Sequence, residues 1–502
     1  MGIVIKQGIK STIVSYIGIV IGTFNVLWLY PMFLEPETIG LLRVLQDLPL
    51  LIALFVQMGA TSIIDKFFFY FQEEKKNTNG FLFLVLFYPF VCFIIFFVMF
   101  ILGQETWKSV FNVKSPLVSD FFIYILPLVA FMMYTYILEA YLRAYSKVVF
   151  PTFIREVLIR LVLTLIVILY SQRILSLNDS ILSLTVMYGL SPVILFIYLY
   201  KLDILDLRPK LKHLNKPLLK EMGIYLFFAI SGTAGGIIVY KLDSVMLGLM
   251  NGLEQVAIYS IAYFIGTIVE IPKRSISQAS IPILSNAFKE ENFEMINSLY
   301  KKTALNQLLA GILIFIAIWL NVDDIFNLIP HSKNYIAGKY VILFVGFAKL
   351  ADMATSINGE IIIFSKYFRF NLFSTIALAI LTITTNVILI PIYKEVGAAI
   401  AFAITIVLFN TLRSYYVWWR MSIHPLSLEM IYLICFLVIM LTGNYFIKPN
   451  QHSILESVFY IVIKCVVIST IYFFMIRKFK ISTDLNGLID RILKRYNIKL
   501  NI

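Results

Sequence analysis

Charged side chains interrupt several long apolar segments of this sequence, and these charges are the residues best suited to bind an ion or an anionic group. A charge at the centre of a membrane helix costs roughly 2.5–3.5 kcal/mol on insertion scales, so it requires a partner, a water-filled cavity or a ligand. The bases are candidates for contacts with an anionic group, and the acids for a coupling ion or a polar cleft. The bases are Arg43, Arg155, Arg160, Lys241, Lys349 and Lys464, and the acids are Asp47, Asp243, Glu270 and Asp352.

Lys349 and Lys464 carry the strongest signal, because each lies near the middle of its apolar segment. At about 1.5 Å of rise per residue, each would lie on the order of 15 Å from the outer end of a membrane helix. Lys349 has Asp352 three residues on, which suits a pair on one helix face, whereas Lys464 has no acid within four residues. A lysine without a partner at this depth favours an aqueous cavity or an anionic ligand, and a structural role remains the alternative.

Other charges allow two explanations as well. Arg43 and Asp47 are four residues apart, so pairing within one helix competes with a functional role. Lys241 and Asp243 are two residues apart and point to different faces, so each needs its own partner.

Arg155 and Arg160 lie toward the inner end of their segment, where long side chains can extend to the membrane interface. Glu270 is followed one turn later by Lys273 and Arg274, so pairing within the helix explains these charges as well as a polar cleft does.

Small and polar residues share one face of the first apolar segment, at Ser11, Ser15, Gly18, Gly22 and Asn25. Their spacings of three and four residues are those of one helix face. Close packing against another helix and the lining of a cavity are the two explanations.

The composition places these residues in an all-α integral membrane protein. Of 502 residues, 60% are hydrophobic and 14% are charged, whereas soluble domains are about 45–50% apolar and about 25% charged. A membrane helix needs about 20 apolar residues, and about fourteen segments meet this condition. They are 11–30, 39–58, 81–102, 121–141, 149–170, 181–200, 222–249, 256–276, 305–320, 340–364, 372–390, 396–418, 430–446 and 454–474.

Lysine and arginine gather in alternate loops, on the side that holds the N-terminus, and an even number of spans puts both termini there. Because cytoplasmic loops are enriched in these residues, both termini are predicted to be cytoplasmic. The net charge of +13 then reflects topology rather than nucleic-acid binding, since the basic residues are spread over many short loops.

The loops also suggest a division of the chain. We expect a six-helix bundle over 1–202, a basic linker over 203–220, a second six-helix bundle over 221–420, two further helices over 421–476 and a basic amphipathic tail over 477–502. The tail pattern suits a helix on an anionic membrane surface. Glu37-Thr-Ile-Gly-Leu and Glu254-Gln-Val-Ala-Ile open corresponding helices of the two bundles, which indicates a parallel repeat.

Three motifs resemble those of a known transporter superfamily. Lys241-Leu-Asp-Ser-Val-Met-Leu-Gly precedes Leu253-Glu-Gln-Val-Ala-Ile-Tyr, and Val396-Gly-Ala-Ala-Ile-Ala-Phe opens the twelfth segment. With the helix layout, they are similar to the polysaccharide (O-antigen type) flippase branch of the multidrug/oligosaccharidyl-lipid/polysaccharide exporter superfamily. Ala257 stands where that family commonly has glycine.

The resemblance implies two bundles that face a central cleft and open it alternately to either side of a bacterial cytoplasmic membrane. It implies export of a polyprenyl-diphosphate-linked oligosaccharide for surface polysaccharides such as lipopolysaccharide, with membrane lipids and other assembly proteins as partners. No covalent chemistry and no cofactor are implied, and coupling to protons or sodium stays open.

Two other functions remain as alternatives. A drug or cation antiporter of the same superfamily should bury more acids than bases, whereas the deep charges here are mainly basic. A membrane polymerase or glycosyltransferase normally needs a large extramembrane loop or a catalytic cluster. The loops are short, the four histidines are scattered, and no phosphate-binding loop motif occurs.

Overall fold

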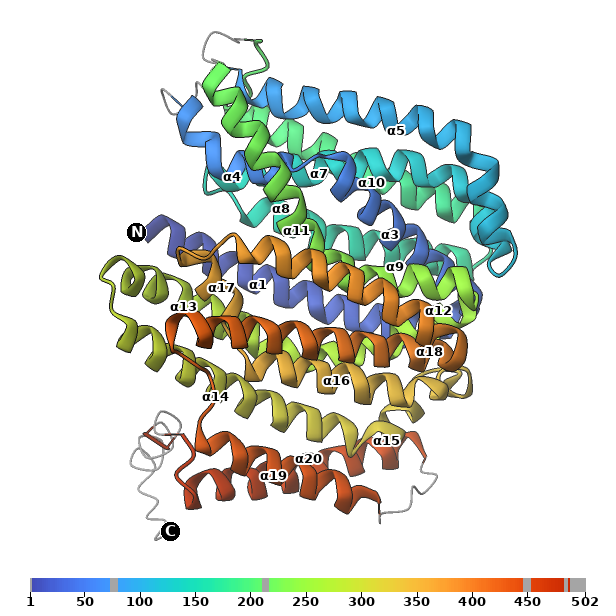
Figure 1. The fold of residues 1–502 in the computed structure, drawn as a ribbon. Helices are drawn as coiled ribbons and strands as arrows, with labels where there is room; N and C mark the ends of the chain where they lie inside the picture. Colours follow the sequence, from blue (N-terminus) through green and yellow to red (C-terminus); the bar gives the residue numbers. More distant parts are fainter. Residues whose placement is uncertain (1, 73–79, 210–215, 446–452, 483–485, 488–502) are drawn as a thin grey trace. The chain divides into compact units, whose positions relative to one another are not determined.

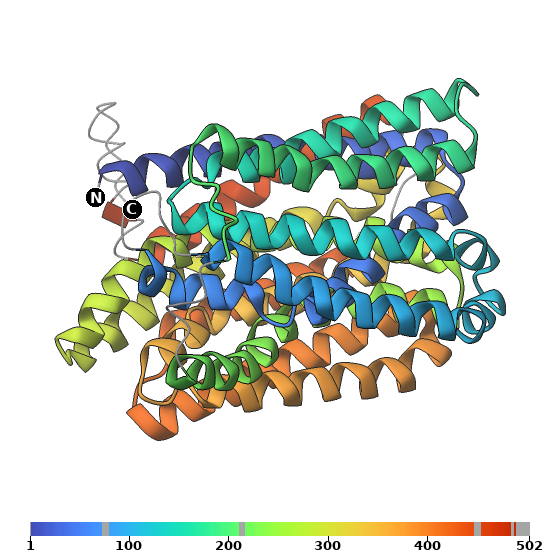
Figure 2. The same ribbon diagram turned by 90° about the horizontal axis from the view of Figure 1, so that it is seen from above.

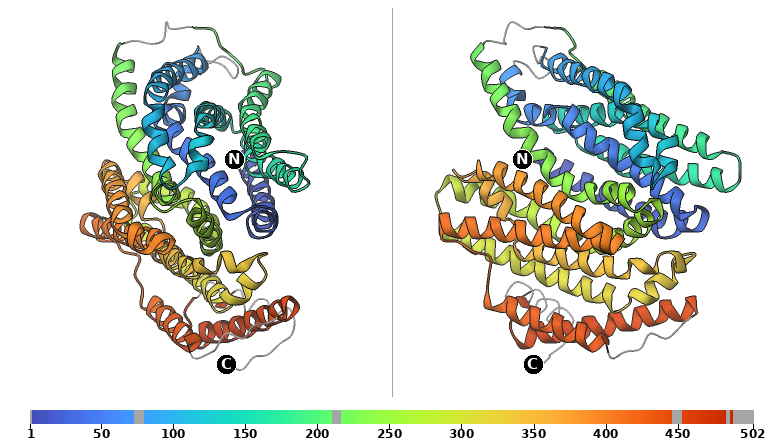
Figure 3. Two further views of the ribbon diagram at one scale, coloured as in Figure 1. Left: turned by 90° about the vertical axis from the view of Figure 1, so that its right-hand side faces the viewer. Right: turned by 45° about the vertical axis from the view of Figure 1, so that its right-hand side comes forward.

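The computed structural model of the chain consists of helices joined by loops, over the residues that the structure describes. These residues are 2–72, 80–209, 216–445, 453–482 and 486–487. The chain divides into two compact units, Met1–Ser260 and Ile261–Ile502. Within each unit most long helices run along a common direction, which is clearest when they are seen nearly end-on (Figure 3).

The first unit brings together the helices that precede residue 261, and α12 crosses the division. Its elements are α1 (Gly2–Phe24), η1 (Asn25–Leu29), α2 (Tyr30–Phe33), α3 (Pro36–Val56), α4 (Ala60–Phe71), α5 (Phe81–Asn112), α6 (Pro116–Asp120), η2 (Phe122–Tyr124), α7 (Ile125–Ala144), α8 (Val149–Phe153), η3 (Ile154–Leu158), α9 (Ile159–Ser171), α10 (Leu177–Lys201), α11 (Lys216–Met250) and α12 (Leu253–Thr267). In this unit α3 packs against α7 and α11, and α7 against α10 (Figure 1).

The second unit continues from α12. Its elements are η5 (Ile268–Glu270), α13 (Ile271–Lys289), α14 (Phe293–Trp319), α15 (Val322–Asn327), η6 (Ser332–Asn334), η7 (Ile336–Gly338), α16 (Lys339–Ala354), α17 (Asn358–Phe364), α18 (Phe370–Met421), α19 (Leu428–Tyr445) and α20 (Ile454–Lys478). The element α18 consists of two helices that meet at a kink at Lys394, can be followed in orange in Figure 2, and packs against α16 and α17. The two red helices α19 and α20 lie side by side, with Phe436 against Tyr472 (Figure 1).

Several helices begin where the sequence supplies a cap. Ser176 and Asp179 form a capping box at the start of α10, and Ser453 with Glu456 forms another at α20. Each box satisfies backbone N–H groups that have no partner inside the helix. Proline at position 36 opens α3, where its missing N–H costs nothing.

The described part of the chain contains nine helices that are long and apolar enough to span a membrane, or ten if a bent pair counts as one span. The bent pair is Ile336–Ala354 with Asn358–Phe364. The nine are Lys10–Phe33, Pro36–Val56, Phe81–Asn112, Phe122–Ala144, Leu177–Lys201, Leu253–Lys289, Phe293–Trp319, Phe370–Met421 and Ile454–Lys478.

This number is lower than the fourteen predicted spans, and α11, which covers the predicted span 222–249, is not among the nine. Most of the remaining difference has identifiable reasons. Phe370–Met421 has 52 residues and covers two predicted spans in one element. The predicted span 149–170 forms α8, η3 and α9, and it carries the three charges of Arg155, Glu156 and Arg160. The described apolar part of α19, Leu428–Gly443, is shorter than 18 residues. All fourteen predicted segments are largely helical, so the prediction of an all-helical, multi-pass architecture is confirmed.

Apolar side chains face outward along several helices. Only 22% of the most apolar stretch of Phe81–Asn112 is buried inside the structure. Leu102 and Met99 are among its exposed residues. Hydrocarbon chains are the surroundings in which such a surface is stable, because helices satisfy their backbone polar groups internally and leave apolar side chains outside.

Two predicted segments fall partly outside the described residues, and the tail does so for most of its length. The amphipathic tail over 477–502 lies there except for its first residues, which end α20 and continue to Ser482, and for residues 486–487. The linker over 203–220 lies partly there, at 210–215, and its last residues from Lys216 onward already belong to α11.

A sharp turn divides α18 at Lys394, whose backbone has φ 51° and ψ −129°. These backbone angles are unfavourable for any residue that has a Cβ atom, and they suit glycine. Lys394→Gly should therefore raise the stability by about 1 kcal/mol, whereas Tyr393→Gly at the preceding, negative-φ position should lower it by about 1 kcal/mol. Thermal unfolding of the purified variants in detergent measures both changes. Equal losses at the two positions would contradict the strain at Lys394.

Candidate functional site

Arg155 lies in a short π-helical segment, η3, inside an otherwise α-helical stretch. Single π-helical turns of this kind occur frequently at functional sites. The Arg155 guanidinium donates through Nη1 to Glu139 Oε2 of α7 at 2.5 Å and through Nε to Glu156 Oε1 at 3.3 Å. Glu156 also accepts from Arg160 Nη2 at 2.9 Å. Arg155 and Arg160 therefore both pair with buried or half-buried acids, so each of these bases has a carboxylate partner inside the unit.

The small-residue face of the first helix packs against this segment. A Cβ atom on Gly18 would meet the backbone of Glu156, and one on Gly22 would meet the Arg160 guanidinium. Arg160 Nη1 donates to the carbonyl oxygen of Gly18, and Asn25 Nδ2 donates to the carbonyl oxygen of Arg160 at 3.0 Å. Of the two explanations for this face, close helix packing is the one that the structure supports.

A second group of charges connects α3 and α11. Arg43 lies 2.6 Å from Asp47 Oδ2, which confirms the predicted pair four residues apart. Lys241 Nζ lies 2.6 Å from Asp47 Oδ1, and Ser244 Oγ donates to Oδ2 at 2.7 Å. Asp47 is 1% exposed, so its carboxylate is surrounded by two cations and a hydroxyl inside the unit.

Asp243 has a partner different from that of Lys241, as its spacing predicts. The Tyr259 hydroxyl of α12 donates to Asp243 Oδ2 at 3.0 Å, and Asp243 is buried. Asp243 therefore fixes α12 to α11 within the first unit.

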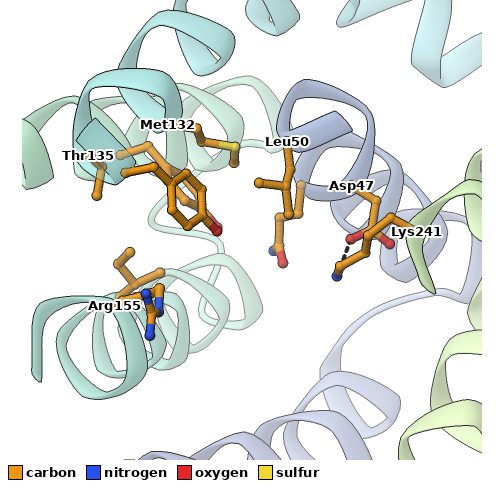
Figure 4. Close-up of a pocket in the computed structure, with 10 residues that line it drawn as sticks. Asp47, Leu50, Met132, Thr135, Arg155 and Lys241 are labelled. Atoms are coloured by element: carbon orange, nitrogen blue, oxygen red, sulfur yellow. Dashed lines mark hydrogen bonds and ion pairs between the residues drawn. The ribbon is translucent and has the colours of Figure 1, made fainter. Parts of the chain in front are cut away.

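A cavity of about 130 Å³ lies among these charged groups of the first unit (Figure 4). This volume has room for several water molecules, since one probe-sized site needs only about 10–15 Å³. Its charged lining consists of Asp47, Arg155 and Lys241, two cations against one carboxylate. Figure 4 shows Arg155 on the opposite side of the cavity from the Asp47 and Lys241 pair. Its remaining lining residues are Gln46, Leu50, Met132, Thr135, Tyr136, Ile159 and Tyr188.

Lys349 lies in the second unit and is 1% exposed. Its Nζ contacts Glu270 Oε2 at 2.5 Å and lies 5.4 Å from the ring centre of Phe402. The expected pairing of Lys349 with Asp352 is therefore wrong. Glu270 also binds Arg274 at 2.7 Å, which confirms the predicted pairing within that helix.

Asp352 instead pairs with a residue of α13. Lys273 Nζ lies 2.5 Å from its Oδ2, and Asn410 Nδ2 of α18 donates to Oδ1 at 3.1 Å. The carboxylates of Glu270 and Asp352 each connect two helical segments of the second unit.

Lys464 of α20 has a carboxylate partner that its own helix does not provide. Its Nζ lies 2.8 Å from Asp324 Oδ2 of α15, and Asp324 is 4% exposed as a residue. The expectation that Lys464 has no acidic partner is wrong, because the partner lies 140 residues away in the sequence. This ion pair attaches one of the last two helices to the rest of its unit.

Sequence reasoning missed several residues of the cavity and its surroundings. Glu139 is an acid inside the predicted span 121–141, and this signal was available from the sequence. Tyr136 and Tyr188 are ordinary residues of apolar segments, and nothing in their spacing marks them. Asp324 lies in a segment that is predicted to be a loop, so nothing in the sequence indicates that its side chain is buried.

Comparison with known proteins decides the family. The model of a family described as "Polysaccharide biosynthesis protein" matches residues 5–288, more than half of the chain. The chain belongs to this family. A second model, MatE, matches residues 237–388. A search of curated proteins finds no match.

Solved structures show the fold of this polysaccharide biosynthesis protein. "Lipid II flippase MurJ, inward closed conformation" superposes with a TM-score of 0.72 at 13% identity, covering 93% of this chain and 99% of that chain. An inward-facing multidrug resistance MATE family transporter of the MOP superfamily gives a TM-score of 0.58 at 13% identity, covering 82% and 98%. The chain therefore belongs to a polysaccharide biosynthesis family and has the fold of these multi-pass membrane proteins.

Proposed function

We propose that this family member moves a polyprenyl-diphosphate-linked oligosaccharide from the inner to the outer leaflet by alternating access. Membership of the polysaccharide biosynthesis family supports a substrate that carries a sugar. The observation that carries it is the cavity of the first unit, where Arg155 and Lys241 outnumber the single carboxylate of Asp47. When the groups bound to the lining are counted as well, four cations stand against three carboxylates; they are Arg43, Arg155, Arg160 and Lys241 against Asp47, Glu139 and Glu156. An excess of one positive charge in a site of low dielectric favours an anionic ligand.

The chemistry of the proposed substrate matches this site. Its diphosphate needs compensating cations, its sugars need a polar route across hydrocarbon, and its apolar tail remains in the lipid. The planar Arg155 guanidinium presents donors that suit phosphate oxygens, and the Lys241 ammonium adds a point charge. The similar fold of a lipid II flippase supports a lipid-linked substrate.

The four remaining bases, Arg43, Arg160, Lys349 and Lys464, do not line the cavity, and their contacts decide which role we propose for each. Arg43 shares Asp47 with Lys241, and Arg160 shares Glu156 with Arg155, so both set the charge of the cavity from behind its lining. Lys349 and Lys464 stay candidates for the head group in the second unit, although each is bound to an acid. Asp47, Asp243, Glu270 and Asp352 stay candidates for a coupling proton or cation.

The topology is part of the same proposal. It has about fourteen spans, arranged as two six-helix bundles related by a parallel repeat and followed by two further helices. Both termini are on the cytoplasmic side of a bacterial inner membrane. Surface polysaccharides such as O-antigen are the proposed destination of the sugar.

A second candidate function is the export of organic cations, which the MatE match over 237–388 favours. Cation export needs acids in excess at the binding site, and the cavity of the first unit has the opposite balance. Uptake of organic cations into everted vesicles would favour this alternative over the flippase.

The proposal is tested by removing the protein from its own cells. Lipid-linked oligosaccharide is expected to accumulate in the inner leaflet, while its synthesis continues and surface polysaccharide is lost. Mass spectrometry of the extracted lipids identifies the sugar. Unchanged lipid-linked intermediates together with normal surface polysaccharide would contradict the proposal.

A further inference from the structure

Glu139 and Arg155 form a contact that the proposed function leaves unexplained. We propose that Glu139 tunes the affinity of Arg155 for the diphosphate, so that substrate binds weakly enough to be released on the far side. Glu139 is then a positioning residue that acts through Arg155. The inference rests on the proposed function, because it assigns a role within the same site.

The geometry places Glu139 behind the cavity and Arg155 at its edge. The Glu139 side chain is 7% exposed, whereas that of Arg155 is 39% exposed and lines the cavity. The 2.5 Å contact joins Glu139 Oε2 to Arg155 Nη1. The other carboxylate oxygen, Oε1, is buried and has no hydrogen-bond partner among the described residues. A buried carboxylate with one unsatisfied oxygen is costly, which indicates a role other than stability.

The two acids that bind Arg155 are not equivalent. Glu156 is shared with Arg160, whose guanidinium also reaches the carbonyl oxygen of Gly18. Arg143, one turn after Glu139 on α7, forms its own bidentate pair with Asp65 of α4. Arg155 is therefore the cation in direct contact with Glu139, and a change at Glu139 acts first on Arg155.

The π-helical turn supplies an independent reason to expect function here. It extends from Ile154 to Leu158 and contains both Arg155 and Glu156. Such a turn interrupts the regular helical hydrogen bonding, and turns of this kind occur frequently at functional sites.

A transporter must release what it binds, so its affinity has to remain moderate. The negative charge of Glu139 offsets the positive charge of Arg155 and so weakens its attraction for phosphate. Glu139→Gln keeps the size and one acceptor oxygen but removes the charge. We expect roughly tenfold tighter diphosphate binding in this variant, because removing a charge at contact distance changes affinity by at least this factor.

The test uses the purified full chain in lipid nanodiscs with farnesyl diphosphate as the probe, and farnesol as the control for the apolar tail. Binding is measured by titration calorimetry for the wild type, Glu139→Gln, Glu139→Ala, Arg155→Gln and the double variant Glu139→Gln with Arg155→Gln. Asp65→Asn is the matched control, because it removes the acid from another arginine pair of the same unit. Glu139→Asp keeps the charge and should retain wild-type affinity.

The expected result is tighter binding in either neutral Glu139 variant, no such gain in the Arg155→Gln background, and no gain in Asp65→Asn. In transport, the neutral variants should show a lower half-saturating concentration together with a lower maximal rate. A merely structural role for Glu139 does not produce this combination.

The role of Glu139 would be overturned if folded Glu139→Gln and Glu139→Ala bound farnesyl diphosphate no more tightly than the wild type. It would also be overturned if Glu139→Gln raised the affinity equally in the Arg155→Gln background. Either result would leave the proposed function standing. Wild-type protein that binds farnesyl diphosphate no better than farnesol would instead overturn the proposed function, and the role of Glu139 with it.

Discussion

Glu270→Gln should destabilise the second unit by about 3–5 kcal/mol, the usual loss when one member of a buried ion pair is removed. Lys349 is 1% exposed and its ammonium lies 2.5 Å from the Glu270 carboxylate. Removing the negative charge leaves a buried positive charge without the carboxylate that compensates it. The temperature at which half of the purified protein aggregates in detergent measures the effect.

A double variant separates this explanation from a general loss of packing. Glu270→Gln combined with Lys349→Met should recover most of the stability, because an apolar side chain of similar length needs no counter-charge. Asp323→Asn is the matched control. The Asp323 side chain is 38% exposed and that of its partner Lys339 is 28% exposed. An ion pair this exposed should contribute less than about 1 kcal/mol to stability. A double variant as unstable as Glu270→Gln alone would contradict the assignment.

Arg155→Gln and Lys241→Gln should each reduce transport of the lipid-linked oligosaccharide at least tenfold, with the double variant lower still. Each substitution removes a positive charge from the cavity lining, and a charge-assisted contact to phosphate contributes about 1.5–3 kcal/mol. The amount of lipid-linked sugar that reaches the outer leaflet, divided by the amount of protein in the membrane, measures the effect.

The control for this prediction is Arg143→Gln, because Arg143 is paired with Asp65 and does not line the cavity. Lys349→Gln and Lys464→Gln test the remaining bases in the same assay. Normal transport by both, at normal protein levels, would remove them from the head-group site. Normal transport by Arg155→Gln and Lys241→Gln would contradict the site itself.

Spacing along the sequence indicated two of the ion pairs that form between residues close together in the chain. Arg43 with Asp47 and Glu270 with Arg274 are four residues apart, and both pairs are present. The positions of the helices also followed from the apolar segments, because membrane-spanning length and apolarity are local properties of the chain.

Contacts between helices were not predictable in the same way. Lys464 finds Asp324 at a separation of 140 residues, and Lys349 binds Glu270 in preference to the nearer Asp352. Which helices are neighbours depends on packing, and a spacing rule contains no information about it. The π-helical turn at Arg155 has no sequence signature either, so the association of Arg155 with Glu139 appeared only in the structure.

We propose that the cavity of the first unit recognises the diphosphate of a lipid-linked sugar during transfer between leaflets. The most direct measurement reconstitutes the purified protein in liposomes that contain a fluorescent polyprenyl-diphosphate-linked oligosaccharide, and follows how fast the sugar becomes accessible to an external glycosidase. The sugar should become accessible faster in liposomes with wild-type protein than in protein-free liposomes. Arg143→Gln should give the same rate as the wild type. The double variant of Arg155→Gln and Lys241→Gln should give the rate of protein-free liposomes. Equal rates with and without the wild-type protein, across liposomes in which it is folded, would contradict the claim.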